Sequence, residues 1–409
     1  MTRSNFLFSA LAITTLAFTS CSDDNDDSAV SYNVPTDYTF ERNSATTVDF
    51  SGQTSRLLML GEMGSYISTA AKNKTAVDKT VLVNMYSNTN NAFSTTELNT
   101  SGKQLKDKTA ASKDYFSLFL GGGSTTEKVA VQAFFETQLT NASIAGALPQ
   151  VSASAGVAGS YVDGSSTRLF APNGLEPQQV LLKGMMGACL LDQTVNNYLS
   201  LNKLDEASNT ENNTNKVVET GKNYTTMEHL WDEAYGYIYG AGGGKYWDSY
   251  INQVNADADF NTVTADIKNA FIKGRAAIVA NDYNTRNAQI DIIKTKLALV
   301  PAVRAVFYLQ EGKGKLVTAN GAAAFHALSE AYGFIMCLRY TNKPGTNAPY
   351  FTRTEVDTIL STLTAGTNGF WDVDYLNPAA ANQPKILDNL STQIAAKFGF
   401  TVAQAATVN

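Results

Sequence analysis

HLWDEAYGYI (residues 229–238) recurs 97 residues later as HALSEAYGFI (residues 326–335), with six of the ten positions identical. The chain contains only two histidines, and each is the first residue of one copy. Duplication of a helical unit explains this pattern better than coincidence does. The repeat therefore predicts a fold that contains two related helical units.

Each copy places its polar side chains on one face of the predicted helix. Residues four and seven positions apart share a face, so His229 lies beside Glu233 and close to Gly236. His326 and Glu330 repeat the arrangement, again followed by a glycine. A glycine on this face would let a second helix approach closely.

Helical periodicity extends well beyond the repeat, and no series of segments alternates with a period of two. The nine prolines are few enough to permit long helices. Predicted helices cover residues 53–73, 127–142, 177–201, 227–239, 262–281, 288–310, 322–340, 355–363 and 386–398. Residues 101–126, 151–174 and 202–224 are expected to be linkers. The sequence predicts an all-α fold with an N-terminal helical half (37–224) and a C-terminal half (225–409).

Composition excludes several classes of protein. The chain has 409 residues, 44% of them hydrophobic, which is enough for a sizeable core. Its formal net charge is −6 and it has no basic run, which argues against a nucleic-acid partner. Three cysteines are too few for a disulfide-built scaffold.

The N-terminus resembles the signal peptide of a bacterial lipoprotein. Residues 1–20 carry Arg3 and then a 13-residue apolar run, residues 6–18, which is too short to span a bilayer. The run leads into Phe18-Thr19-Ser20-Cys21, where Cys21 would be lipidated. An ordinary signal peptide with a chance cysteine is the alternative. Residues 21–36 are expected to form an acidic tether, which either directs export to the cell surface or serves as a solvated leash.

The histidines and glutamates of the repeat are candidate metal ligands. If the two copies pack about a pseudo-twofold axis, two imidazoles and two carboxylates meet, a suitable first shell for iron, zinc or manganese. This hypothesis assigns metal binding to His229, Glu233, His326 and Glu330. Two alternatives remain open. The His–Glu pairs could only fix helix packing through hydrogen bonds, or one glutamate could act as a general base.

Four other residues are candidates for a site or for the core. Glu62 lies between apolar residues, so it is either a buried, paired carboxylate, a further metal ligand, or part of an exposed stripe. Asp232 replaces the serine of the second copy and either adds a carboxylate to the site or faces solvent. Cys189 and Cys337 lie in apolar helical runs and are expected to be small buried side chains, with a disulfide between them left open.

The residues around the second histidine resemble the imelysin-like group of bacterial envelope proteins. That group carries a Gly-x-His-x-x-Glu signature on a helix, and Ala324-Phe325-His326 resembles its start, with Ala324 in place of the glycine and Ser329 in place of the glutamate. The resemblance implies a pair of pseudo-symmetric helical bundles joined by long loops. It also implies a role in iron uptake or as a metallopeptidase.

Together these observations predict an outer-membrane lipoprotein that faces the periplasm or the cell surface and binds a metal ion or metal complex in iron acquisition. Iron or zinc is the expected cofactor. The expected partners are the membrane, through the lipid on Cys21, and outer-membrane transport proteins, but not nucleic acid. A metallopeptidase and a non-catalytic structural or interaction lipoprotein are the alternatives.

Overall fold

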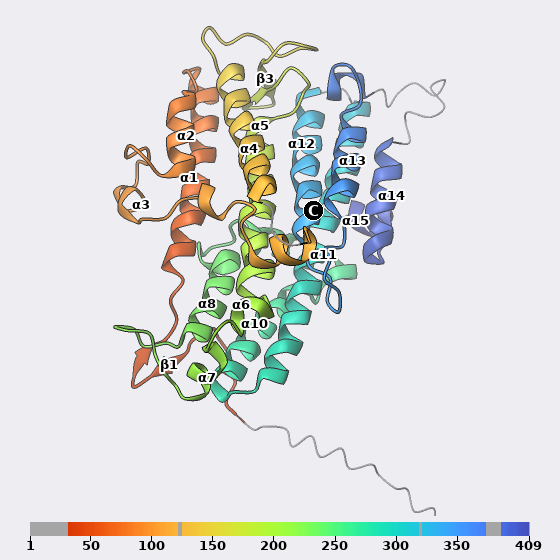
Figure 1. Ribbon diagram of the computed structural model, residues 1–409. Helices are drawn as coiled ribbons and strands as arrows, with labels where there is room; N and C mark the ends of the chain where they lie inside the picture. The colour runs from red at the N-terminus through yellow and green to blue at the C-terminus, as the bar shows by residue number, and fades with distance from the viewer. Residues whose placement is uncertain (1–31, 122–124, 319–320, 374–385, 409) are drawn as a thin grey trace, which may run out of the picture. The chain divides into compact units, whose positions relative to one another are not determined.

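Long helices make up most of the computed structural model, which describes residues 32–121, 125–318, 321–373 and 386–408 (Figure 1). The prediction of a mostly helical chain is confirmed. The longer helices are α1 (Ser51–Asn73), α2 (Lys79–Ser87), α4 (Thr125–Ala145), α5 (Pro177–Met185), α8 (Thr226–Tyr239), α9 (Trp247–Ala256), α10 (Val263–Ala280), α11 (Tyr283–Thr318), α12 (Gly321–Cys337), α13 (Arg353–Leu363) and α14 (Ile386–Phe398).

Shorter elements connect these helices. The short α-helices are α3 (Thr96–Thr100), α6 (Leu201–Leu204), α7 (Asn209–Thr214) and α15 (Val402–Ala406). The 3₁₀ segments are η1 (Lys106–Lys108), η5 (Ala258–Phe260), η6 (Leu338–Tyr340) and η7 (Gly369–Asp372). The π-helical segments are η2 (Tyr115–Phe119), η3 (Met186–Leu191) and η4 (Thr194–Tyr198). Two of the linkers predicted from the sequence therefore contain short helical turns.

Local sequence signals explain where the repeat helix α8 begins. The Thr225 hydroxyl accepts a hydrogen bond from the Glu228 backbone N–H, and the Glu228 carboxylate accepts one from the Thr225 backbone N–H. Each bond satisfies a backbone donor that would otherwise lack a partner at the helix end. The cap places His229 at the start of the helix, with its carboxylate neighbour Glu233 one turn later.

The helix predicted over residues 177–201 starts as expected but does not stay α-helical. Pro177 lies in its first turn, where a missing N–H costs nothing. After Met185 the chain widens into the π-helical segments η3 and η4. Gly187 lies against α12, since a Cβ there would come within 2.7 Å of the Cys337 Cα. Cys189 and Cys337 are both free and buried, so no disulfide joins them.

Two small hairpins occur, one before the first predicted helix and one in a predicted linker. In one, β1 (Glu41–Arg42) pairs with β2 (Ala45–Thr46). In the other, β3 (Gly159–Asp163) pairs with β4 (Ser166–Phe170), with Asp163 opposite Ser166 across a two-residue turn. Gly164 begins that turn with a positive φ of 57°, which glycine adopts without strain. The prediction that residues 151–174 form only a linker was therefore wrong.

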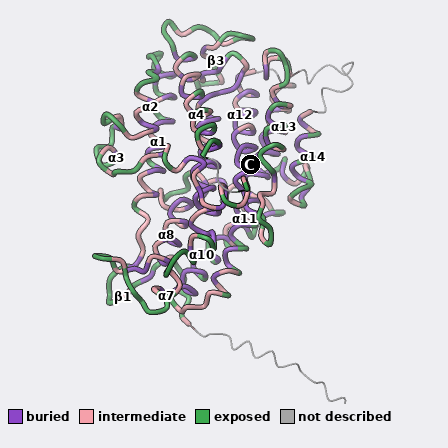
Figure 2. The backbone as a smooth tube through the Cα atoms, viewed as in Figure 1, coloured by how far each residue is buried: buried purple, intermediate pink, exposed green. Residues whose placement is uncertain are grey.

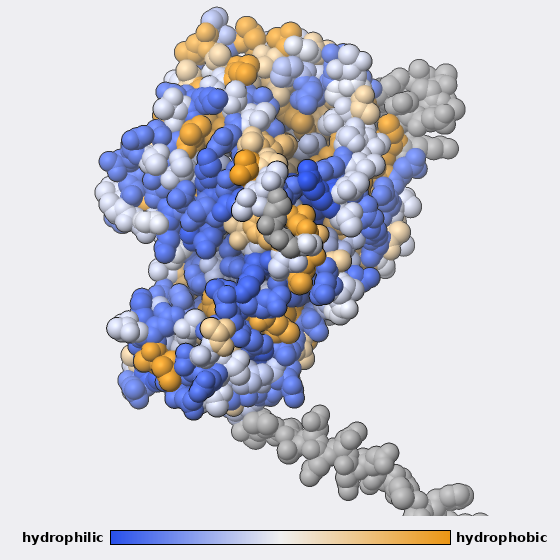
Figure 3. Space-filling model, viewed as in Figure 1, coloured by the Kyte–Doolittle hydropathy of each residue, from blue (hydrophilic) through white to orange (hydrophobic). Residues whose placement is uncertain are grey.

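Residues 33–409 form one compact unit, and helices from both predicted halves pack together within it. α1 contacts α8, and α5 contacts α12, so contacts cross the predicted boundary at residues 224–225. The longest buried run covers residues 184–196, from the end of α5 through η3 into η4, and α12 is also mostly buried (Figure 2). The visible surface is mostly hydrophilic with scattered apolar side chains (Figure 3). The division into two halves stays a prediction.

The predicted signal peptide (1–20), Cys21 and most of the tether (21–36) lie outside the described residues. Within the described residues, no helix combines the length and apolar character needed to cross a membrane.

Candidate functional site

The second copy of the repeat lies on α12, which packs along α5 (Figure 1). The two helices run in the same direction, because successive turns of α5 meet successive turns of α12. The contacts join Glu176 to His326, Lys183 to Gly333, and Gly187 to Cys337. This parallel pairing places Glu176, at the start of α5, beside His326, and Lys183, near the end of α5, beside Glu330.

His326 lies between two carboxylates. Its Nδ1 is 2.6 Å from Glu176 Oε2, and its Nε2 is 3.5 Å from Glu330 Oε2. An ionised carboxylate can only accept a hydrogen bond, so Glu176 favours the proton on Nδ1. On the other side of the ring, Nε2 faces the Glu330 carboxylate. With 18% of its side chain exposed, His326 can be reached from solvent.

Glu176 is almost completely buried at the start of α5, with 1% of its side chain exposed. Its backbone N–H donates to the Ser329 hydroxyl at 2.8 Å, which ties the end of α5 to α12. Arg168, from β4, lies 3.6 Å from Glu176 Oε1 and offsets the buried charge. Glu176 Oε1 has no hydrogen-bond partner among the described residues. The hairpin that the sequence did not predict therefore supplies a cation to the site.

Glu330 faces a second cation. The Lys183 ammonium on α5 lies 3.2 Å from Glu330 Oε1, and both side chains are mostly buried. Burial alone would raise the pKa of the Glu330 carboxyl, but Lys183 and His326 outweigh it, so this pKa lies below its ordinary value. Glu330 is therefore ionised at neutral pH.

The first copy, on α8, has a different environment. The His229 ring stacks on Tyr224, with ring centroids 4.4 Å apart, and His229 Nδ1 has no hydrogen-bond partner among the described residues. Glu233 accepts a hydrogen bond of 2.8 Å from the Gln53 side-chain amide on α1. Both residues line a polar cavity of about 540 Å³ that also includes Lys108. Within the described part of the chain, the histidine of this copy therefore forms no ion pair with a carboxylate.

The repeat glycines do what the sequence predicted: each admits a partner helix. A Cβ on Gly236 would lie 2.4 Å from the Phe50 Cβ and 3.1 Å from the Gln53 Cβ of α1. A Cβ on Gly333 would lie 2.4 Å from the Lys183 Cβ of α5. Gln53 and Lys183 thus occupy matching places, because each lies against a repeat glycine and donates to the repeat glutamate.

The two copies do not form one shared site in the described part of the chain. No hydrogen bond or ion pair among the described residues joins His229 or Glu233 to His326 or Glu330. Nor do these residues include any group of three or more His, Cys, Asp or Glu side chains that could hold a metal ion. The expected convergence of two imidazoles and two carboxylates is not found there. The assignment of the four residues as metal ligands stays a prediction.

Asp232 neither faces solvent nor adds a carboxylate to the His229 site. It is fully buried, accepts a 2.9 Å hydrogen bond from Arg275 Nε and accepts another of 2.7 Å from the Tyr38 hydroxyl. Arg275 also lies 3.4 Å from the buried Glu228. Burial raises the pKa of Asp232 despite the opposing effect of Arg275. This ion cluster lies inside the packing of α8 and α10, away from any opening.

Glu62 holds a loop. Its two carboxylate oxygens accept hydrogen bonds from the backbone N–H groups of Ser94 and Thr95, at 2.8 and 3.1 Å. Glu62 lies on α1 and forms part of the wall of a cavity, but no histidine lies beside it among the residues that line that cavity. The geometry therefore separates Glu62 from both repeat histidines.

Sequence reasoning missed Glu176, Lys183 and Arg168. Lys183 is the single charged residue in the run VLLKGMMGACLL (180–191), and a lone charge in an apolar run predicts a buried partner. Asp163-Gly164 is a hairpin signal that could have indicated the strand carrying Arg168. No signal in the sequence showed that Glu176 faces His326.

No curated protein and no solved structure matches the chain. The imelysin-like resemblance is not confirmed by these comparisons. The model of one family, described as "Domain of unknown function (DUF4856)", matches residues 35–401, which include both copies of the repeat. The chain therefore belongs to the DUF4856 family.

Proposed function

We propose that this protein is a lipid-anchored component of the cell envelope that binds a metal ion or metal complex at His326. The observation that supports this is the placement of the His326 ring, with Nδ1 at 2.6 Å from Glu176 and Nε2 facing Glu330. Metal-binding histidines commonly donate their second ring N–H to a carboxylate, which orients the ring and raises its basicity. In this proposal Glu176 orients the ring, and His326 Nε2 and Glu330 are the ligands.

The donor set fits a metal only in part. The 3.5 Å between His326 Nε2 and Glu330 Oε2 suits two ligands that each lie about 2.0–2.2 Å from one ion. Lys183, at 3.2 Å from the other Glu330 oxygen, disfavours a further positive charge. Two protein donors and a nearby ammonium therefore fit a metal that arrives with ligands of its own, preferably anionic ones. A chelated ferric ion has this character, which supports a role in iron acquisition.

The envelope location rests on the sequence before the described residues. The apolar run 6–18 followed by Ser20-Cys21 supports lipidation of Cys21, and the acidic residues after it support a solvated tether. An outer-membrane lipoprotein that binds a metal complex would deliver it to outer-membrane transport proteins. Metabolic labelling with a palmitate analogue should mark the protein, and Cys21→Ala should abolish the label.

The imelysin-like pair of pseudo-symmetric bundles belongs to the same proposal. The matching contacts of Gly236 with Gln53 and of Gly333 with Lys183 support a duplicated helix pair, α1 with α8 and α5 with α12. In this view only the α5–α12 copy has kept the charged site, while the α1–α8 copy has kept the packing.

The test compares the two histidines directly. Ferric citrate and Zn²⁺ would each be titrated into the full chain and into His326→Gln, with His229→Gln as the matched control. His326→Gln should weaken binding at least tenfold, Glu176→Gln should weaken it about 10- to 100-fold, and His229→Gln should leave it unchanged. Equal affinity in the original protein and in His326→Gln, or no binding of either probe, would favour a purely structural role for the His–Glu pairs.

A further inference from the structure

A cavity of about 550 Å³ lies between α1, α5 and α9, and the site described above does not use it. This volume is within the range of small-molecule sites in proteins. Apolar side chains from two helices form one part of the wall, among them Leu57, Leu182 and Met186. Lys183 and Tyr250 also line the cavity. The wall therefore combines an apolar surface with one mostly buried ammonium group.

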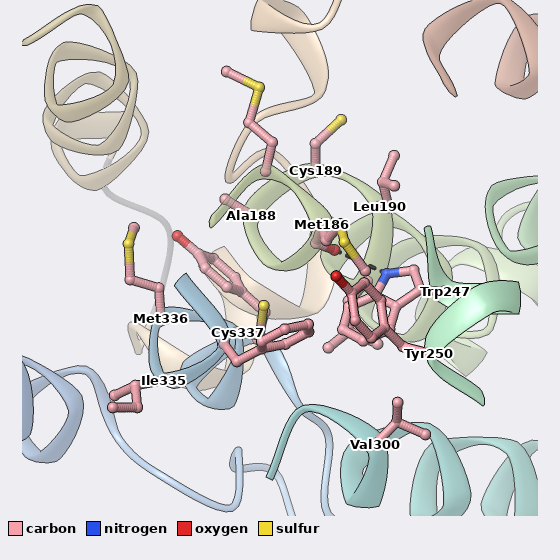
Figure 4. Close-up of a cluster of buried hydrophobic side chains, with 14 of the residues drawn as sticks. Met186, Ala188, Cys189, Leu190, Trp247, Tyr250, Val300, Ile335, Met336 and Cys337 are labelled. Atoms are coloured by element: carbon pink, nitrogen blue, oxygen red, sulfur yellow. Dashed lines mark hydrogen bonds between the residues drawn. The ribbon is translucent and has the colours of Figure 1, made fainter. Parts of the chain in front are cut away.

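Lys183 is the point where this cavity meets the His326 site. Its ammonium lies 3.2 Å from Glu330 and 5.1 Å from the centre of the Tyr250 ring. Figure 4 shows Tyr250 beside Trp247, whose indole N–H donates to the Met186 carbonyl at 3.0 Å and so fixes α9 against η3. The cation is thus held on a rigid wall between packed helices.

The residues in and around the cavity wall include several charged side chains. Glu330 is influenced by Arg304 as well as by Lys183. Arg304 is buried, stacks near three aromatic rings and has no ion-pair partner among the described residues. Lys245, which is exposed, adds a second cation to the described lining, where Glu62 is the only carboxylate. Asp248 lies next to this lining and accepts a hydrogen bond from the Gly244 backbone N–H. Within the described lining the two lysines therefore outnumber the one carboxylate.

The backbone at the entrance is held in an unusual conformation. Tyr246 lines the cavity with a positive φ of 52°, which is rare for a residue with a Cβ and costs about 1–3 kcal/mol. Its hydroxyl lies 3.0 Å from where a Cβ on Gly61 would be, so the absence of a side chain at Gly61 makes room for the ring. Strain of this kind tends to occur at ligand sites.

We propose that this cavity binds a small organic monocarboxylate with an apolar body, whose carboxylate pairs with Lys183. The apolar part would lie against Leu57, Leu182 and Met186, and the carboxylate would lie at the inner end beside the Lys183 ammonium. A carboxylate bound there shares the ammonium with Glu330. The inference concerns a second site and does not depend on metal binding at His326.

Hexanoate is a suitable probe, with uncharged 1-hexanol as its matched control, titrated into the full chain by calorimetry in buffer that contains EDTA. Hexanoate should bind at least tenfold more tightly than 1-hexanol, because a hydrogen bond to a charged group is among the stronger polar contacts. Lys183→Met should remove that preference. Lys72→Met, on the exposed end of α1, should not.

A second variant guards against loss of folding, because Lys183→Met leaves Glu330 without its nearest cation. Ser249→Phe fills the cavity from α9 without changing any charge, and it should lower hexanoate affinity at least tenfold. The EDTA in the buffer removes free metal ions, which separates this site from the metal proposal. Equal binding of hexanoate and 1-hexanol, absence of hexanoate binding, or full binding to Ser249→Phe would overturn the inference.

Discussion

The two copies of the repeat have the same packing and different charges. In each, a repeat glycine lies against a partner helix, and a side chain of that helix donates to the repeat glutamate. On α12 the donor is the ammonium of Lys183, whereas on α8 it is the neutral amide of Gln53. The buried charges of the α8 copy lie instead at Asp232, where the α12 copy has Ser329.

This difference separates the contacts that hold each helix pair together from the Lys183 charge that only the α5–α12 pair has. In the α1–α8 pair the partner helix contributes only a neutral amide to the glutamate, with Tyr198 and Lys108 also beside it. Buried ion pairs usually add little net stability, because removing two charges from water costs about as much as their attraction returns. The charged cluster of His326, Glu176 and Glu330 is therefore not explained by packing alone.

The largest effect is expected from breaking the buried ion cluster of the first copy. Arg275→Met leaves Asp232 fully buried without its counter-charge. We expect the free energy of unfolding in urea to fall by about 3–5 kcal/mol. The change should appear as a lower midpoint of the unfolding transition.

The control for this experiment makes the first copy resemble the second. Arg275→Met combined with Asp232→Ser removes both charges. It also gives position 232 the serine that the second copy has at the matching position, Ser329. The double variant should regain much of the stability lost in Arg275→Met, while Glu228 keeps its 2.7 Å ion pair with Arg42. Stability of Arg275→Met equal to that of the original protein would show that the cluster contributes nothing to folding.

A smaller loss of stability is expected from changes at the repeat glycines, where the two copies have the same packing. Gly236→Ala and Gly333→Ala should each lower the free energy of unfolding by about 1–3 kcal/mol, because the new Cβ overlaps a partner helix at 2.4 Å. The same urea experiment measures both variants. Similar losses at the two positions are the expected result.

Gly314 provides the opposite control. It lies inside α11, and a Cβ there would meet no atom of the described residues within 4 Å. Gly314→Ala should therefore raise stability by about 0.5–1 kcal/mol through the better helix propensity of alanine. A stabilising effect of Gly236→Ala or Gly333→Ala would contradict the close helix approach at the repeat.

Much of the helical architecture could be predicted from the sequence because it depends on local signals. The capping box at Thr225, the early proline Pro177 and the helix at residues 386–398 follow from short-range chemistry and periodicity. The hairpin that carries Arg168 was missed, because its residues do not alternate clearly and only Asp163-Gly164 marked the turn. The change from α- to π-helix after Met185 has no obvious signature in the sequence either.

The sequence predicted only those contacts of the candidate site that lie within one helix. Spacing along α12 placed His326 next to Glu330, and the structure has them 3.5 Å apart. Glu176 and Lys183 come from another helix, more than 140 residues earlier in the chain, so periodicity within the repeat could not indicate them. The expectation that both histidines meet rested on symmetry, and the described residues instead pair each repeat helix with its own partner.

The smallest expected effect is a change in how stability depends on pH. The pKa of Glu330 in the folded protein lies below its ordinary value. Burial raises this pKa, but Lys183 and His326 together lower it by more. The folded state therefore binds fewer protons than the unfolded state, and ionised Glu330 adds stability above pH about 4.3 that is lost as the pH falls through its folded pKa. Lys183→Met raises that folded pKa.

The slope of unfolding free energy against pH, measured in urea between about pH 5 and 3, should become shallower in Lys183→Met, by less than about 1.4 kcal/mol per pH unit. Gln53→Met is the matched variant in the first copy. Because it removes a neutral hydrogen-bond donor and no charge, it should change the slope less than Lys183→Met does. Equal slopes for Lys183→Met and the original protein would mean that Lys183 does not stabilise the ionised form of Glu330. The charge difference between the two copies would then have no energetic consequence.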